Sequence, residues 1–174
     1  VEGIGAAVAP IQVLQAVNAL VGSSIISRFF LLLFRLFGDR LAAMIGATLL
    51  AFSHSFWFYL NGEVHVFSVA CLLVAAWALL TMELQRTSTW ILAGVMHGLA
   101  ILFHLDNISF GGLVLTVSLI SPLMKGRRLK LLVVYACALI VVVAVPYCLA
   151  GYILSPDIPP WSYWYSALLR EVVR

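Results

Sequence analysis

Charged residues are scarce in this chain of 174 residues, where Lys, Arg, Asp and Glu make up 10% and hydrophobic residues 64%. A soluble domain could not bury so much apolar surface in one core, so the composition excludes a soluble globular protein. It predicts an all-α fold, a polytopic bundle of transmembrane helices whose first partner is the lipid bilayer. The net charge of +3 is too small to indicate a nucleic-acid partner.

Cysteine is rare too, and the motifs of several enzyme classes are missing. The three cysteines, Cys71, Cys137 and Cys148, lie in apolar stretches without CxxC spacing. Neither the HExxH metal motif nor the GxSxG elbow of serine hydrolases occurs. Ser53 and His54 are adjacent and would point about 100° apart on a helix, so they could not pair as nucleophile and base. The sequence therefore predicts neither a metal site nor a cofactor.

The apolar stretch from residue 41 to residue 84 is interrupted only by Asn-Gly-Glu-Val-His at 61–65. As one helix it would be roughly 60 Å long, twice the roughly 30 Å bilayer core, so the chain must reverse at Asn61-Gly62. The same reasoning puts a break at Asp106-Asn107. Hydropathy then predicts a membrane domain over 1–154, with about six spans at 11–34, 41–60, 64–84, 88–104, 108–124 and 131–154. Residues 155–174 are predicted to form an external, aromatic and Pro-rich interfacial segment.

Basic and acidic residues alternate along the predicted connections. The second and fourth connections carry Glu63 and Asp106 without any Lys or Arg, and the basic residues lie in the other three. These basic residues are Arg35 and Arg40, then Arg86, then Lys125, Arg127, Arg128 and Lys130. By the positive-inside rule, the basic connections face the cytoplasm. Both acidic turns and both chain ends are then expected outside, at a bacterial inner membrane or in the lumen of the endoplasmic reticulum.

The two predicted external turns hold ionisable side chains that could form one site. Glu63 and His65 occupy the first turn, and His104 and Asp106 the second. Facing a cavity, Glu63 and His65 could bind a substrate hydroxyl or phosphate, or transfer protons. A structural alternative is that Glu63 stabilises the N-terminus of a helix capped by Asn61.

Other side chains are predicted to lie at the same membrane face. His54 lies about two helical turns before the first turn and could join the site. Trp57 belongs to the aromatic run 56–59, which is typical of an interfacial belt and could also stack on a sugar ring. Imidazole with carboxylate suits zinc or manganese. His97 and His104, however, stand about 10 Å apart along one helix, too far for one ion.

Several motifs resemble a known family. Phe52-Ser-His-Ser-Phe-Trp57 followed by Asn61-Gly-Glu-Val-His65 resembles the fS.sFW...aEvY pattern of the GT-C superfamily, and is most similar to protein O-mannosyltransferase-like membrane proteins. Gly98-Leu-Ala-Ile-Leu-Phe-His104 is similar to that family's GLal.H segment, and Leu14-Gln-Ala-Val-Asn-Ala-Leu-Val-Gly22 to its second-span region. The resemblance covers roughly residues 11–124.

The resemblance implies an inverting glycosyltransferase that uses a polyprenyl or dolichyl phosphate sugar donor and a protein or glycan acceptor on the external side. Glu63 matches a family glutamate and is expected to support catalysis, while His65 stands where the family has tyrosine. The expected substrate-binding residues are His65, His54, His104, Asp106 and Trp57. The family's catalytic acid lies in an external loop before the second span. Because Glu2 is the only acid before residue 11, we expect a fragment that lacks the first span and that loop.

Two alternatives from other functional classes stay open at this point. In a proton-coupled or ion-coupled transporter, the acids and histidines of the two external turns would relay protons or bind an ion. In a noncatalytic membrane scaffold, none of these side chains would be needed for activity.

Overall fold

The computed structural model describes residues 2–53, 65–121 and 126–154. Within these ranges the regular structure consists of six α-helices and one 3-10 helix, without a strand, which confirms the predicted all-α fold. In chain order the elements are α1 (Glu2–Phe37), α2 (Arg40–Ala51), α4 (His65–Thr81), α5 (Thr87–Phe103), η1 (Leu105–Phe110), α6 (Gly111–Ile120) and α7 (Arg128–Leu154).

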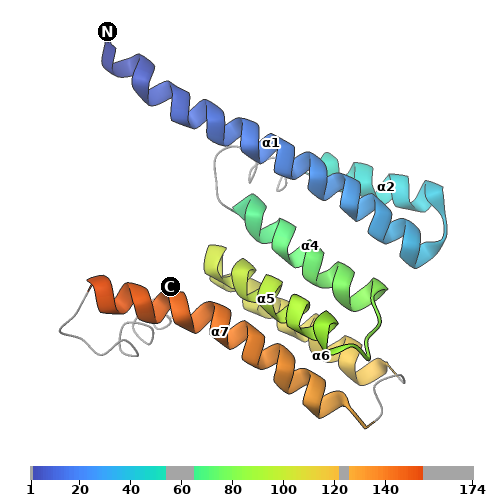
Figure 1. Ribbon diagram of the computed structural model, residues 1–174. Helices are drawn as coiled ribbons and strands as arrows, with labels where there is room; N and C mark the ends of the chain where they lie inside the picture. The colour runs from blue at the N-terminus through green and yellow to red at the C-terminus, as the bar shows by residue number, and fades with distance from the viewer. Residues whose placement is uncertain (1, 54–64, 122–125, 155–174) are drawn as a thin grey trace.

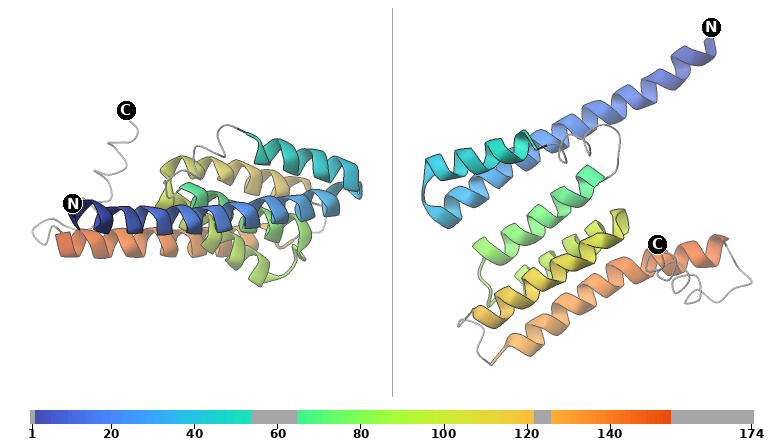
Figure 2. Two further views of the ribbon diagram at one scale, coloured as in Figure 1. Left: turned by 90° about the horizontal axis from the view of Figure 1, so that it is seen from above. Right: turned by 180° about the vertical axis from the view of Figure 1, so that it is seen from behind.

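Five of the helices lie side by side in the order α2, α1, α4, α5, α7 (Figure 1, Figure 2). Within this row α2 runs antiparallel to α1 and α4 runs antiparallel to α5, whereas α1 and α4 run in the same direction, as do α5 and α7 (Figure 1). The first turn of α4 and the last turn of α5 therefore lie at the same end of the row, where η1 follows α5. This arrangement brings His65, at the start of α4, close to His104, at the end of α5.

Two helices are long and apolar enough to cross a membrane, within Gln12–Phe37 and Arg128–Ile153, with mean hydropathy of 1.8 and 2.6. Only 22% and 17% of these windows are buried, so most of their apolar surface faces outward, as in a lipid-exposed helix. The other apolar helices are shorter, at 10–17 residues. Six spans therefore remain a prediction.

The helix bounds differ from the predicted spans at several ends, and α1 covers Glu2–Phe37 where a span at 11–34 was predicted. α2 ends at Ala51, before the predicted end at residue 60, and the Ser53 hydroxyl donates to Leu50 O at 2.9 Å across this end. The 3-10 helix η1 begins before the predicted span 108–124 and includes its first three residues. Its hydrogen bonding follows the 3-10 pattern, since the Asn107 N–H donates to His104 O, three residues back. The predicted reversal at Asn61-Gly62 and the interfacial segment 155–174 lie outside the described residues.

The α1–α2 connection is built by two residues. Gly38 has φ of 68°, a left-handed conformation that suits glycine. Asp39 caps α2, since its Oδ1 accepts from Leu41 N at 2.8 Å and from Ala42 N at 3.4 Å. This short reversal holds α1 and α2 antiparallel and adjacent.

Helices α5 and α7 approach closely at two glycines spaced four residues apart. A Cβ on Gly94 would lie 2.5 Å from Tyr135 O, and one on Gly98 would lie 3.0 Å from the Val142 Cβ, so α7 fills the space that side chains would need. This small-xxx-small pattern is typical of membrane helices that pack backbone to backbone. The main core cluster lies beside it and comprises Leu79, Trp90, Ala93, Val114, Leu131 and Tyr135.

Candidate functional site

Two histidines meet where α4 begins and α5 ends. His65 is the first residue of α4 and His104 ends α5 as its C-cap. Their ring centroids lie 4.4 Å apart and the rings are inclined by 62°, an edge-to-face contact. The structure thus brings together two of the residues predicted for the site, although 39 positions (104 − 65) separate them in the sequence. Glu63, His54 and Trp57 lie outside the described residues.

Asp106 lies two residues after His104, and both its backbone and its side chain approach His104 Nδ1. The Asp106 backbone N–H points to His104 Nδ1 at 3.3 Å, and the Asp106 Oδ2 lies 3.4 Å from the same nitrogen. A neutral Nδ1 accepts from the N–H, whereas a protonated Nδ1 pairs with the carboxylate. The His104 and Asp106 side chains are 37% and 87% exposed, so this pair is open to a ligand.

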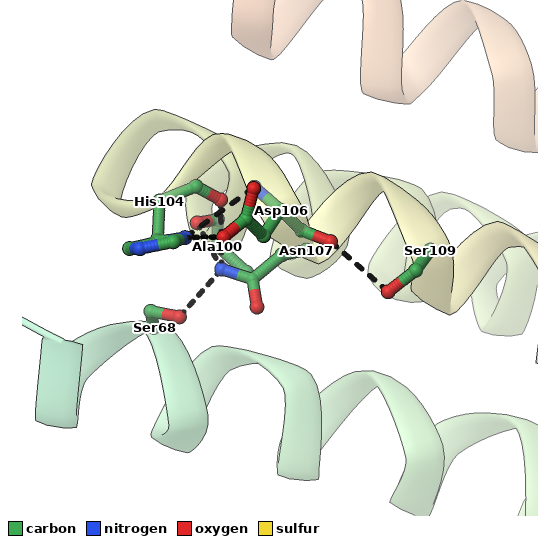
Figure 3. A network of polar contacts seen from close by, with 6 residues as sticks. All are labelled: Ser68, Ala100, His104, Asp106, Asn107 and Ser109. Carbon is green, nitrogen blue, oxygen red and sulfur yellow. Dashed lines mark hydrogen bonds and ion pairs between the residues drawn. The ribbon is translucent and has the colours of Figure 1, made fainter. Parts of the chain in front are cut away.

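Asn107 organises the turn (Figure 3), whereas its place in the sequence predicts only a helix break. Its Nδ2 lies 2.6 Å from Ser68 Oγ on α4, 2.9 Å from Ala100 O on α5 and 2.9 Å from His104 O. One amide group therefore joins α4, α5 and η1. The sequence feature that could have indicated this role is the position of Asn107 just after a helix end, where an asparagine side chain can bond to backbone groups.

His97 supports the turn from inside the helix row. It is 1% exposed, its Nε2 lies 2.7 Å from Asn107 O, and its Nδ1 contacts the Tyr135 hydroxyl on α7. Because a carbonyl oxygen can only accept, Nε2 must donate, and the neutral ring then accepts from Tyr135 at Nδ1. Both ring nitrogens are used, so His97 is a structural residue rather than a ligand for an ion.

The remaining charged contacts lie at the opposite end of the helices. Arg35 lies over the Trp77 ring with 4.7 Å between its guanidinium carbon and the ring centroid. Glu83 and Arg86 form a two-bond ion pair at 2.6 and 3.1 Å in the α4–α5 connection. The two ends thus differ in character, one cationic and one carrying imidazoles and a carboxylate.

The described side chains favour binding of a polar ligand over binding of an ion. Among the residues that the structure describes, no three His, Cys, Asp or Glu side chains are close enough to hold a metal. Imidazole can donate to a phosphate or exchange a proton near neutral pH, and a carboxylate can accept from a hydroxyl. A ligand with hydroxyl and phosphate groups fits this set of donors and acceptors.

Comparison with known families gives one match. A family model described as dolichyl-phosphate-mannose-protein mannosyltransferase matches residues 4–149. The matched range contains Glu63, His65, His104 and Asp106 and the helices α2 to α6 in full. Comparisons with curated proteins and with solved structures returned no match.

Proposed function

Because the chain belongs to the dolichyl-phosphate-mannose-protein mannosyltransferase family, we propose that it transfers mannose from a dolichyl or polyprenyl phosphate to a protein or glycan acceptor. The family match confirms the resemblance seen in the sequence, and it supports a membrane glycosyltransferase of the mannosyltransferase type. We further propose that transfer takes place at the end of the helices that carries His65 and His104, on the periplasmic or lumenal side.

The observation that carries this proposal is the pairing of His65 with His104 beside the exposed Asp106. A polyprenyl phosphate keeps its tail in the hydrocarbon and its phosphate at the interface, so its sugar meets residues at the ends of apolar helices. Imidazole N–H groups can hold the phosphate oxygens there. The opposite end presents guanidinium groups without such a cluster of imidazoles among the described residues.

The proposed reaction breaks the bond between the sugar C1 and the phosphate oxygen while the acceptor hydroxyl forms a bond to C1. The acceptor loses its proton to a base, and the lipid phosphate leaves with the bonding electrons. His65 and His104 stabilise the charge that develops on the leaving phosphate. Glu63, which matches the family glutamate, is proposed to support this step.

The test is a transfer assay with the protein expressed from its complete reading frame and reconstituted in lipid nanodiscs. Labelled dolichyl phosphate mannose is the donor, and a Ser/Thr-rich peptide or a short mannoside is the acceptor. We expect labelled product from the wild type, much less from His104→Ala, and wild-type rates from Glu83→Gln, an exposed residue of the opposite end. A wild-type protein that transfers no mannose to either acceptor contradicts the proposal.

A further inference from the structure

The Asn107 amide has only one possible orientation in this structure. Its Nδ2 faces three oxygen acceptors, and two of them, Ala100 O and His104 O, are carbonyls. Turning the amide over would set its Oδ1 against these two carbonyl oxygens, which cannot donate. The oxygen is therefore directed away from the acceptors (Figure 3), and no bond to it occurs within the described residues. Asn107 thus presents a fixed acceptor beside His104.

Two buried side chains hold the backbone of this residue. His97 donates to Asn107 O from Nε2, and the Tyr135 hydroxyl on α7 occupies the other ring nitrogen. The carbonyl oxygen of Asn107 can only accept, so the neutral ring carries its proton on Nε2 and accepts from the Tyr135 hydroxyl at Nδ1. The close contact of α5 with α7 at Gly94 is what places Tyr135 within reach. A chain of contacts thus runs from α7 through α5 to the external turn.

We propose that Asn107 Oδ1 is a ligand contact of the external site that accepts a hydrogen bond from a sugar hydroxyl, with His97 and Tyr135 as the residues that position it. The assignment of a sugar rests on the proposed function. An acceptor-only atom repels a phosphate and bonds a hydroxyl, so Asn107 complements the histidines, which can donate. The hydroxyl belongs either to the donor sugar or to a glycan acceptor.

The contact is tested by the kinetics of mannose transfer with the reconstituted protein. Loss of one neutral hydrogen bond lowers affinity about threefold to tenfold, so Asn107→Ala is expected to raise KM by that factor with a smaller change in kcat. A rise in KM for dolichyl phosphate mannose assigns the hydroxyl to the donor, and a rise for a mannoside acceptor assigns it to the acceptor. Unchanged KM values for both substrates overturn the contact. Ser118→Ala is the control, since Ser118 is a buried serine of α6 that bonds within its own helix, to Leu115 O at 2.7 Å.

The positioning is tested separately by hydrogen exchange of the amides of residues 105–110, which requires no sugar. His97→Phe is expected to speed exchange there, whereas His97→Gln, whose amide can donate to Asn107 O and accept from Tyr135, restores slow exchange and the wild-type KM. Thr81→Val removes a hydrogen bond at the opposite end of α4, from Thr81 Oγ1 to Trp77 O at 2.7 Å, and is expected to leave this exchange unchanged. Wild-type exchange in His97→Phe, or equally fast exchange in His97→Gln, overturns the positioning.

A second variant covers the case in which His97→Phe fails to fold. Tyr135→Phe removes a single hydroxyl and is expected to speed exchange of 105–110 by a smaller factor, and unchanged exchange counts against the positioning. Failure of the proposed function is recognised independently. A wild type that transfers no mannose overturns that function and the sugar assignment, while the exchange measurements alone decide the positioning.

Discussion

The rings of His65 and His104 contact each other edge to face, with centroids 4.4 Å apart, although 39 positions (104 − 65) separate them in the chain. The contact exists because α4 and α5 are adjacent and antiparallel, so the start of one helix meets the end of the other (Figure 1). It defines the end of the molecule at which a polar ligand can be bound by two imidazoles at once.

The two histidines are expected to act together on the leaving phosphate. Loss of a hydrogen bond to a charged group costs about 1.5–3 kcal/mol, so His65→Ala and His104→Ala should each lower kcat/KM for mannose transfer by about 10-fold to 100-fold. Because the rings touch, the double variant should lose less than the product of the two single effects. Steady-state kinetics of the four proteins form the measurement. Strictly multiplicative losses would show that the residues act independently.

Membrane orientation can be tested with single cysteines in a protein whose Cys71, Cys137 and Cys148 are replaced by alanine. Asp106→Cys is expected to react with a membrane-impermeant maleimide added outside intact cells or spheroplasts. Arg86→Cys, in the connection at the opposite helix ends, should react only after the membrane is opened, because basic connections stay in the cytoplasm. Labelling of Arg86→Cys from outside would reverse the predicted orientation.

Two Gly→Ala changes are expected to have opposite effects on stability, one at the α5–α7 contact and one away from it. Gly94→Ala should destabilise the protein by about 1–3 kcal/mol, since its Cβ would lie 2.5 Å from the backbone oxygen of Tyr135, which cannot move cheaply. At Gly112 of α6, a Cβ meets no described atom within 4 Å, so Gly112→Ala should stabilise by about 0.5–1 kcal/mol. Thermal unfolding of the two variants in one detergent compares them directly. Equal melting temperatures would mean that α7 is not in close contact with α5.

The cap of α2 should contribute measurably to stability. Asp39→Ala removes the acceptor for the Leu41 and Ala42 N–H groups and is expected to cost about 0.5–2 kcal/mol. Asp39→Asn keeps a capping oxygen and should stay within a few tenths of a kcal/mol of the wild type. Denaturation midpoints of the three proteins provide the comparison. A loss as large in Asp39→Asn as in Asp39→Ala would assign the effect to charge rather than to capping.

Much of the coarse architecture could be predicted from the sequence. The breaks near Arg35 and Arg40, near Arg86 and at Asp106-Asn107 could be predicted from hydropathy, because a helix of apolar residues much longer than the bilayer core must reverse. The exact helix ends were less predictable. Side-chain bonds to the backbone, such as that of Ser53 to Leu50 O, decide them, and hydropathy averages over such contacts.

The residues of the candidate site could likewise be predicted only in part from the sequence. His104 and Asp106 were singled out because ionisable groups near apolar spans are costly and stand out in the sequence. Asn107 and Tyr135 were overlooked, since an asparagine in a turn and a tyrosine in an apolar helix are ordinary. Their importance lies in their partners, His97 and Ser68, which come from other helices.

The sequence by itself determined that this protein is helical and suited to a bilayer, because the chain is 64% hydrophobic in long apolar stretches and a helix satisfies its backbone groups within one such stretch. Its motifs also determined the family. Only the tertiary structure decided that His65 meets His104 and that Tyr135 and His97 support Asn107. Those relations depend on which helices are neighbours and how closely they pack, and Gly94 lets α5 approach α7 to the distance that one hydrogen bond requires.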